Sequence, residues 1–264
     1  MPHALTPCHT PPLLTLADFA PLAQELARHA QAMHPRECCG LVVRRAPDVL
    51  AYMACNNVAV GSLGEDRFEI DAAQYAQAED EGEIVAICHS HPNASANPSE
   101  ADLVMCERTG LPWLIMGYPS QVLRLVQPSQ YEAPLRGRAF HHGVLDCYTL
   151  LQDYYRRELG LVLPEFARAD EWWVPDADGK AQNLYVDHFQ EAGFEEVAQP
   201  LLLHDVLLMQ VKSDRLNHAA VYLGEGKILH HLYGRPSCED VWGGYWQRHT
   251  GKVLRHREVM GVTA

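Results

Sequence analysis

One stretch, residues 84–102, constrains the fold of this chain more than any other part of the sequence. It opens with an apolar run at 84–88, which predicts a short buried strand. His89 and His91 follow directly, and because side chains alternate along a strand, both project from the same face of its end. Pro92 ends the strand, since a proline has no N–H to donate to the ladder. The sequence therefore predicts a strand that presents two imidazoles side by side.

A helix start completes this stretch. Ser99 is a favourable N-cap residue, and Asp102 lies three positions later in the first turn. The fold would therefore aim His89, His91 and Asp102 at a common point. Two histidines and one aspartate supply three zinc ligands and leave a fourth position for water, as in catalytic zinc sites. By themselves, however, Ser99 and Asp102 are also a plain capping pair, and His-X-His pairs occur on solvated strand ends.

The spacing of these residues matches a known signature. His-X-His-Pro, six further residues and Ser-X-X-Asp resembles the JAMM motif of the Mov34/MPN/PAD-1 metalloproteases at every motif position. The resemblance implies that His89, His91 and Asp102 bind Zn²⁺ as a cofactor. It also implies that the Ser99 hydroxyl donates a hydrogen bond to the oxyanion that develops during amide hydrolysis.

Such a site still needs a base from outside this stretch. Glu37 lies in Glu-Cys-Cys-Gly-Leu-Val, just before an apolar strand, and matches the glutamate that does this work in the JAMM family. By spacing alone, Glu37 is an ordinary solvated turn residue. The resemblance instead makes it the base that takes a proton from the attacking water, whose pKa zinc lowers to about 7.

The elements around this stretch alternate between helices and strands. Asp18 is expected to cap a helix with apolar residues at helical spacing from Phe19 to Met33, and Pro35 ends it. The pattern predicts an α/β domain within residues 1–126, with residues 1–15 as an extended arm. The other elements expected in it are strands at 41–43, 50–55, 84–88, 113–116 and 122–126 and helices near 72–80 and 99–108.

A segment without clear periodicity separates this domain from the rest of the chain. Residues 127–138 contain two prolines and one glycine, which predicts a linker. Beyond it, Asp146 and Cys147 begin a predicted helix, whose positive N-terminal end favours a thiolate and lowers the pKa of the thiol. A second domain is therefore expected over residues 139–264, with a candidate nucleophile on its first helix.

Two histidines of the second domain are candidate partners of this cysteine. His218 begins a predicted buried strand, and a turn at 225–226 leads into a paired strand that contains His230. In such a hairpin His230 lies beside His218 and orients its ring. A nucleophile, a base and an orienting group are the parts of a Cys-His peptidase. A cysteine at a helix start is also a common packing residue, and 15 histidines make chance pairings frequent.

The order of these motifs resembles a second family. Asp-Cys at a helix start, Asp-Val-Leu-Leu at 205–208 and a histidine before Val-Tyr-Leu-Gly, with a further histidine twelve residues on, resemble NlpC/P60 proteins. The resemblance implies a papain-like cysteine peptidase with Cys147 as nucleophile, His218 as base and His230 as third polar residue. His231 is the alternative third residue, because a one-residue slip of the strand reverses its face.

The match to NlpC/P60 has two departures. The Ser-Gly that usually follows the family cysteine is Tyr148-Thr149 here. No aromatic residue is clearly placed to help form the oxyanion hole, since Phe140 has no hydroxyl and Tyr131 is more remote. These differences affect the expected substrate specificity more than the identity of the nucleophile.

Composition excludes several classes of protein. The net charge of −13 argues against binding to nucleic acid, and no apolar run reaches the roughly 18 residues of a membrane span. The N-terminus lacks the basic and apolar blocks of a secretory signal. The eight cysteines contain no C-x-x-C pair, so most are expected to be buried residues in a reducing cytoplasm.

The order of the two domains resembles the lambda-type phage tail assembly proteins. The expected fold class is α+β, with an α/β JAMM-type metalloprotease domain followed by a papain-like NlpC/P60 domain. The resemblance implies a tail-tip assembly protein with two sites: a zinc-dependent amide or isopeptide hydrolase, and a Cys-His peptidase that cleaves peptidoglycan stem peptides. Its expected partners are other phage tail-tip proteins and peptidoglycan peptides, and its expected location is the host cytoplasm during assembly or the virion tail tip.

Two other functions stay open on the sequence. The chain could be a structural component of the tail tip whose active sites are inactive. It could also be a processing protease for one tail protein, with its second half as a binding module. Complete catalytic sets in both halves favour the bifunctional peptidase over the structural component.

Overall fold

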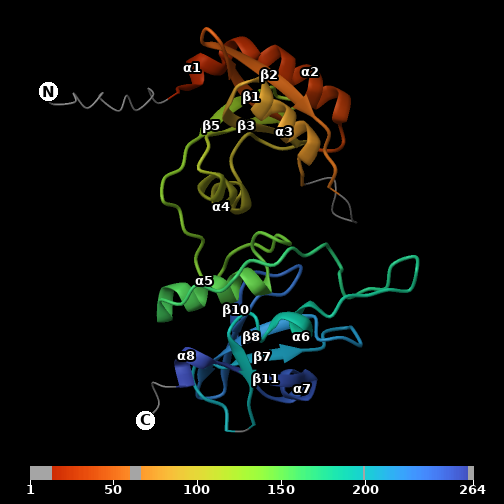
Figure 1. Ribbon diagram of the computed structural model, residues 1–264, viewed down its shortest axis with the longest axis vertical. Coiled ribbons are helices and arrows are strands. Elements are labelled where there is room, and N and C mark those ends of the chain that lie inside the picture. The colour runs from red at the N-terminus through yellow and green to blue at the C-terminus, as the bar shows by residue number, and fades with distance from the viewer. Residues whose placement is uncertain (1–13, 60–66, 199, 261–264) are drawn as a thin grey trace, which may run out of the picture. The chain divides into compact units, whose positions relative to one another are not determined.

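The chain consists of two compact units, Met1–Gln130 and Tyr131–Ala264. The computed structural model describes residues 14–59, 67–198 and 200–260. Each unit has a sheet of its own and combines it with helices, which confirms the predicted α+β class (Figure 1). The division at 130/131 falls inside the predicted linker, whose limits stay a prediction. Most of the predicted N-terminal arm lies outside the described residues.

The first unit is built on a five-stranded sheet with the order β2-β1-β3-β4-β5. β3 and β4 are parallel, and every other neighbouring pair is antiparallel. A parallel pair needs a crossover connection, and helix α4 supplies it (Figure 1). The elements are β1 (Cys39–Arg45), β2 (Val49–Cys55), β3 (Glu83–Pro92), β4 (Trp113–Tyr118), β5 (Leu123–Val126), α1 (Leu16–Phe19), a 3₁₀ turn (Ala20–Leu22), α2 (Ala23–Met33), α3 (Ala72–Glu81) and α4 (Glu100–Thr109).

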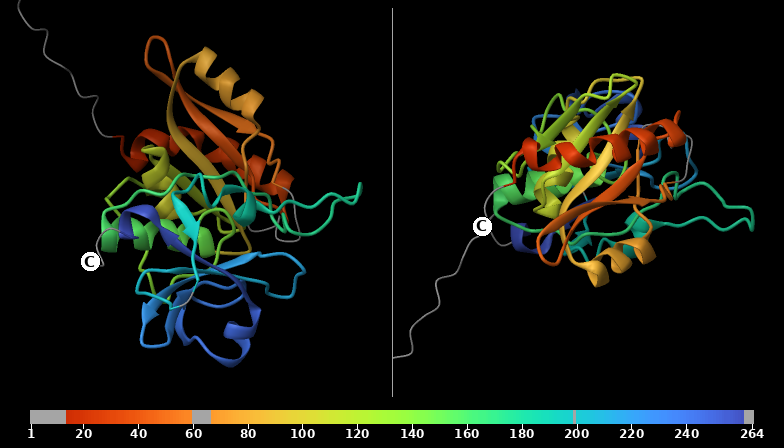
Figure 2. Two further views of the ribbon diagram at one scale, coloured as in Figure 1. Left: turned by 60° about the horizontal axis from the view of Figure 1, so that its bottom comes forward. Right: turned by 90° about the horizontal axis from the view of Figure 1, so that it is seen from above.

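Alternation along the strands divides the core of this unit into two layers. Ala86 and Cys88 of β3 pack with the N-terminal helices, whereas Ile87 packs on the opposite face with residues of α3 and α4. The right-hand view of Figure 2 shows the red N-terminal helices and the gold α3 on opposite sides of the strands. His89 and His91 continue the series of Ile87, so they lie on the face that α4 covers.

The N-terminal helix begins differently from the prediction. Its N-cap is Thr15, not Asp18, and Asp18 is instead the partner three residues later in a capping box. The Asp18 carboxylate accepts hydrogen bonds from the Thr15 N–H, at 2.7 Å, and the Thr15 hydroxyl, at 2.8 Å. A 3₁₀ turn containing Pro21 then separates α1 from α2, because proline has no N–H for the regular helical ladder.

The second unit is built on an antiparallel sheet with the order β10-β9-β8-β7-β11-β6. Helix α5 lies against one face of this sheet (Figure 1) and packs its apolar side there. Trp242 and Trp246 pack against the other face. The elements are α5 (Cys147–Leu159), α6 (Leu184–His188), β6 (Phe194–Glu196), β7 (Val206–Met209), β8 (His218–Gly224), β9 (Lys227–His230), β10 (Cys238–Val241), α7 (Gly244–His249), β11 (Thr250–His256) and α8 (Arg257–Met260).

Two predicted features of this unit are confirmed. Cys147 is the first residue of α5, and Asp146 is its N-cap, accepting a hydrogen bond from the Thr149 N–H at 2.9 Å. β8 and β9 form the predicted hairpin, although β9 ends at His230 rather than at Leu232. The hairpin fixes which histidines can meet, because it sets the register of β8 against β9.

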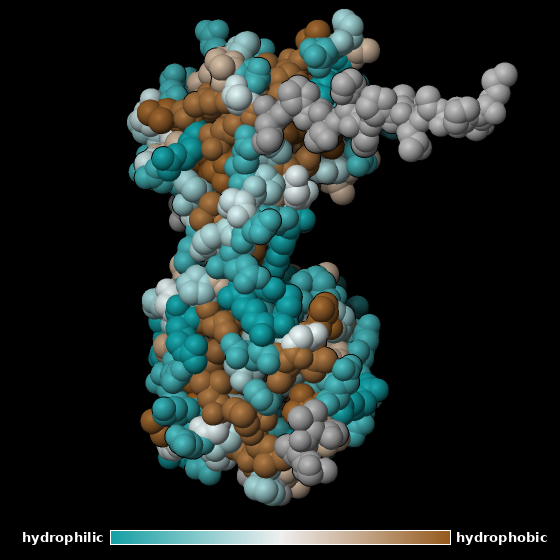
Figure 3. All heavy atoms as spheres, turned by 90° about the vertical axis from the view of Figure 1, so that its left-hand side faces the viewer, coloured by the Kyte–Doolittle hydropathy of each residue, from teal (hydrophilic) through white to brown (hydrophobic). Residues whose placement is uncertain are grey.

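None of the helices in the described part of the chain is both long and apolar enough to cross a membrane. Figure 3 shows hydrophilic residues interspersed with apolar ones over the visible face of each unit.

Candidate metal centre and candidate Cys-His site

Three predicted ligands converge at the carboxyl end of β3. The Nε2 atoms of His89 and His91 are 3.0 Å apart. His89 Nε2 lies 3.3 Å from Asp102 Oδ1, and His91 Nε2 lies 3.2 Å from Asp102 Oδ2. The strand end and the first turn of α4 therefore bring two imidazoles and one carboxylate within contact of one another.

Neighbouring groups hold these side chains in position. His91 Nδ1 donates to the Ser95 carbonyl at 2.9 Å, which leaves the lone pair of the neutral ring on Nε2. The ring of His89 stacks on Phe68, with centroids 4.8 Å apart. Asp102 Oδ2 also accepts the Ser99 N–H at 2.7 Å, so the carboxylate caps the helix as well as facing the histidines. Asp102 therefore belongs both to the capping pair and to the candidate ligand set.

Two of the three candidate ligands are already in the protonation state that binds a metal ion. Burial raises the pKa of Asp102, but hydrogen bonds from His89 and His91 outweigh it and hold the pKa well below its usual range. Burial lowers the pKa of His89, which favours the neutral ring. Burial also acts to lower the pKa of His91, but the hydrogen bond to Asp102 and the other contacts of the ring outweigh it and raise this pKa. Zinc binds an ionised carboxylate and neutral imidazoles, so the donor set fits Zn²⁺, and an ion bound here would displace any extra proton of His91.

Glu37 lies beside this centre. One ligand atom each from Glu37, His89 and His91 lie within 4.8 Å of one another. The side chain is only 6% exposed, so the interpretation of Glu37 as a solvated turn residue is wrong. The Asn57 amide donates to the Glu37 carbonyl at 3.0 Å and fixes this segment against its neighbour. A buried carboxylate is destabilised unless charged or polar groups compensate it, which suits a position next to a metal ion.

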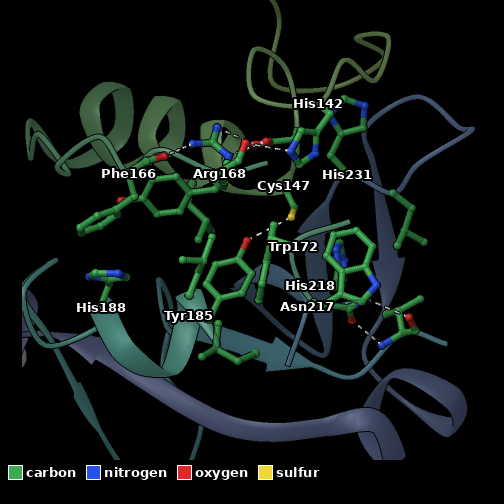
Figure 4. Close-up of a pocket in the computed structure, with 18 of the residues that line it drawn as sticks. His142, Cys147, Phe166, Arg168, Trp172, Tyr185, His188, Asn217, His218 and His231 are labelled. Atoms are coloured by element: carbon green, nitrogen blue, oxygen red, sulfur yellow. Dashed lines mark hydrogen bonds and ion pairs between the residues drawn. The ribbon is translucent and has the colours of Figure 1, made fainter. Parts of the chain in front are cut away.

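The candidate nucleophile of the second unit lies in a pocket. Cys147 and His218 both line a cavity of about 470 Å³, together with aromatic side chains that include Phe166, Trp172 and Tyr185. Figure 4 shows Cys147 Sγ directed at the Tyr185 hydroxyl, and the two atoms are 3.1 Å apart. Within the described residues, no hydrogen bond joins Cys147 to His218. The structure places both residues in one pocket but leaves them unpaired with each other.

A chain of hydrogen bonds runs back from His218. His218 Nε2 lies 3.1 Å from His230 Nδ1, and His230 Nε2 lies 3.0 Å from Asp240 Oδ2. Because an ionised carboxylate only accepts, His230 carries its proton on Nε2 and accepts at Nδ1. His218 then carries its proton on Nε2, which leaves a lone pair on Nδ1. Arg235 Nη2 donates to Asp240 Oδ2 at 2.9 Å and holds the end of the chain.

The electrostatics of Cys147 differ from the sequence prediction. Burial, strengthened by the negative charge of Asp146, raises the pKa of the Cys147 thiol to about 11, although the Tyr185 hydrogen bond lowers it slightly. The predicted low pKa is therefore wrong, because burial and the N-cap carboxylate outweigh the helix dipole. Burial also depresses the pKa of His218, with the neighbouring His230 adding to the effect. Both groups are neutral near pH 7.

Three further residues considered from the sequence are His231, Phe140 and Tyr131. His231 and Phe140 both line the pocket, with ring centroids 5.1 Å apart, but it is His230 that hydrogen-bonds to His218. Tyr131 is not among the described residues that line the pocket. Sequence reasoning missed Asp240 and Tyr185. Asp240 follows a loop whose length hides its register, and Tyr185 lies in a segment where no element was predicted.

Comparison with known proteins assigns a class to each unit. Residues 19–127 match the family described as prokaryotic homologs of the JAB domain, and residues 137–255 match the NlpC/P60 family. The chain thus joins a JAB-type domain to an NlpC/P60 domain, in the order that the sequence predicts. A solved JAB1/MPN domain protein from Archaeoglobus fulgidus is 21% identical, with a TM-score of 0.28, over 43% of this chain and 88% of that chain.

Two curated relatives cover both domains. The chain is 40% identical over 236 residues to tail tip assembly protein K of Escherichia phage N15, covering 89% of this chain and 94% of that protein. It is 39% identical over 187 residues to tail tip assembly protein K of Escherichia phage lambda, covering 69% and 87%. The chain belongs to the family of tail tip assembly protein K of lambda-like phages.

Proposed function

We propose that this chain takes part in the assembly of a phage tail tip and carries two peptidase sites. The names of the two relatives support the first part. The second part is supported by one observation: each unit brings candidate catalytic side chains together, around His89 in the first and around His218 in the second. The partners would be other tail-tip proteins and peptidoglycan peptides, met in the host cytoplasm or at the virion tail tip.

The first unit would hydrolyse an amide or isopeptide bond. His89, His91 and Asp102 would hold Zn²⁺, which supplies Lewis acidity and activates water for attack. The buried Glu37 carboxylate, within 4.8 Å of the histidine nitrogens, would take the proton of the attacking water. Ser99 Oγ accepts the Asp102 N–H at 3.1 Å, and its own O–H would donate to the carbonyl oxygen as that oxygen gains charge.

The second unit would cleave peptide bonds by nucleophilic catalysis. His218 Nδ1 would take the proton of Cys147 as Sγ attacks the carbonyl carbon. The resulting imidazolium would donate from Nε2 to His230, and the charge of Asp240 behind His230 would stabilise it. The attack requires Sγ to leave the Tyr185 hydroxyl and approach His218, since hydrogen bonds in a substrate-free site often tighten only when substrate binds.

One experiment tests both sites. The pure chain is incubated with peptidoglycan stem peptides and with purified tail proteins, and the products are identified by mass spectrometry. Cys147→Ser should abolish stem-peptide cleavage and leave any zinc-dependent cleavage intact, whereas His89→Ala should do the reverse. Cleavage of stem peptides by Cys147→Ser would contradict the assignment of the nucleophile.

Two properties of Cys147 favour a second candidate function, a structural tail-tip component with an inactive cysteine site. The Cys147 thiol has a raised pKa and bonds to Tyr185 instead of His218. If no peptide of either substrate pool is cleaved while the chain still binds purified tail proteins, the structural function replaces the peptidase function.

A further inference from the structure

A second group of metal-ligating side chains lies at the edge of the sheet in the second unit. His230 ends β9, and Cys238 begins β10 directly opposite it in the antiparallel pair. Asp240, two residues further along β10, lies on the same face as Cys238. A ring nitrogen of His230, the Cys238 sulfur and an Asp240 oxygen lie within 4.8 Å of one another. The hairpin-like pairing of two short strands thus creates a cluster of nitrogen, sulfur and oxygen donors.

A positively charged group already marks this cluster as a place for a cation. The Arg235 guanidinium donates to both the Cys238 sulfur and Asp240 Oδ2. The Arg235 side chain is 41% exposed, so it can turn into water with little loss of stability. Its position shows that the sulfur and the carboxylate face the same point and that a cation placed there contacts both.

The donor set selects the ion. One imidazole, one thiolate and one carboxylate form a mixed nitrogen, sulfur and oxygen set that suits zinc, with water in the fourth position. The Asp240 side chain is 34% exposed and Cys238 is half-buried, which gives the ion a path from solvent. We propose that His230, Cys238 and Asp240 bind one zinc ion in place of the Arg235 guanidinium.

Binding at this cluster would reverse the proton positions in the histidine chain. His230 Nδ1 is bonded to His218, so the nitrogen that faces the cluster is Nε2. A metal on Nε2 leaves the ring proton on Nδ1, which must then donate to His218 Nε2. His218 is left with its proton on Nδ1, the atom that would otherwise accept the Cys147 proton. Zinc at this site therefore inhibits the Cys-His peptidase. The inhibition rests on the proposed function, whereas the binding does not.

Cobalt(II) tests the binding directly, because a thiolate ligand gives Co²⁺ a charge-transfer absorption band. The candidate ligands of the first unit, His89, His91 and Asp102, contain no sulfur, so a thiolate band reports on a different site. The full-length reduced chain should bind Co²⁺ with a thiolate band, and so should His89→Ala/His91→Ala. The band should disappear in Cys238→Ser and persist in Cys147→Ser. A missing band in the unsubstituted chain, or a band unchanged by Cys238→Ser, would overturn the proposal.

The proton reversal has its own test. In ¹⁵N-histidine NMR spectra of the full-length chain, zinc should move the His218 proton from Nε2 to Nδ1, and Cys238→Ser should prevent the change. An unchanged His218 tautomer in a chain that shows the thiolate band would overturn the inhibition and keep the site. Absence of peptide cleavage in every variant would refute the proposed peptidase function alone, because neither measurement depends on activity.

Discussion

The two candidate sites are assembled in different ways. In the first unit, His89, His91 and Asp102 come from one short segment, and their ligand atoms already lie 3.0–3.3 Å apart. In the second unit, the reactive residues extend from Cys147 to Asp240, and the nucleophile contacts Tyr185 instead of its base (Figure 4). A site built by one strand, one turn and one helix start is preformed. In the site that depends on distant strands and loops, the candidate nucleophile is not in contact with its candidate base.

The two sites also differ in how their surroundings affect the charged form of a central residue. Histidine partners stabilise the charge of Asp102 and lower its pKa in spite of burial. At Cys147, burial and the neighbouring Asp146 both disfavour the charge and raise the pKa of the thiol. The first site is therefore ready to bind a cation, whereas the second keeps its nucleophile neutral until a base approaches it.

The largest expected effect is loss of the metal from the first unit. The purified chain should carry about one zinc ion at this centre, and His89→Ala should remove it because only two of the three ligands remain. Elemental analysis measures the zinc content of the purified variants, each of which also carries Cys238→Ser to remove the second proposed zinc site. Cys147→Ser is the matched control and should keep the metal. Full occupancy after substitution of both His89 and His91 would disprove the preformed centre.

The next effect concerns the hydrogen-bond chain of the second unit. Asp240→Asn should lower peptide hydrolysis by about 10- to 100-fold, because Asp240 fixes the ring of His230 and, through it, that of His218. ¹⁵N-histidine NMR should show a mixture of tautomers, which a purely structural role would not produce. The control is Glu239→Gln, a substitution on the same strand as Asp240. It alters the ion pair between Glu239 and Arg136 and should retain activity. Equal activity of Asp240→Asn and the parent would remove Asp240 from the site.

The pH dependence of Cys147 should show the contrast between the sites. A pKa near 11 lies about two units above that of an ordinary thiol, so alkylation by iodoacetamide at pH 7.5 should be roughly 100-fold slower. The rate should rise about tenfold per pH unit towards pH 11. Tyr185→Phe should slow the reaction further, since the Tyr185 hydroxyl lowers this pKa. A rate that levels off below pH 8 would restore the low pKa predicted from the sequence.

The ionisation of Cys147 should have a weaker effect on the stability of the fold at alkaline pH than on its alkylation rate. The folded pKa of Cys147 lies above its unfolded value, so its protonated form stabilises the fold below about pH 9. That contribution is lost as pH rises towards 11. Between pH 8 and pH 10.5, the Tm of the parent protein should fall more than the Tm of Cys147→Ala. Thermal unfolding measures this difference. A constant difference would mean that the thiol does not titrate in this range.

The smallest effect is expected from separating the units. Fragments that end near residue 128 and begin near residue 136 should each fold, since each unit has its own sheet and buried core. Calorimetry should give fragment Tm values close to the two transitions of the intact chain. A single cooperative transition in the intact chain, with both fragments aggregated, would show that the domains share one core.

The sequence predicts the local structure of residues 84–102 well because its information is local. Strand alternation, Pro92 and the Ser99 cap position three side chains within one short segment. The burial of Glu37 could not be predicted in this way, because it depends on β1 pairing with β3, with Cys39 opposite His89. The same holds for Asp240, whose contact with His230 is set by the register of β10 against β9.

The second unit shows a further limit of prediction from the sequence. A helix start at Cys147 is visible in the sequence, but the burial that raises its pKa is not. The pocket around it includes Trp172 and Tyr185, from a segment with no periodic pattern. The hairpin and its histidine pair were predictable, because a turn and two alternating runs define them. Local patterns thus identify the residues, and tertiary packing decides their protonation.

Asp102 both caps helix α4 and faces the two histidines, which has a consequence for the order of folding and metal binding in the first unit. One carboxylate oxygen is tied to the backbone N–H of Ser99, and a carboxylate has about four lone-pair positions, so an ion can be accepted without releasing the helix. Small zinc domains often stay unfolded until the metal arrives. Here the polypeptide itself holds the ligand in place, so the conformational entropy of the site is spent during chain folding. If this centre binds zinc as proposed, a newly made chain would reach its native shape before it captures the ion.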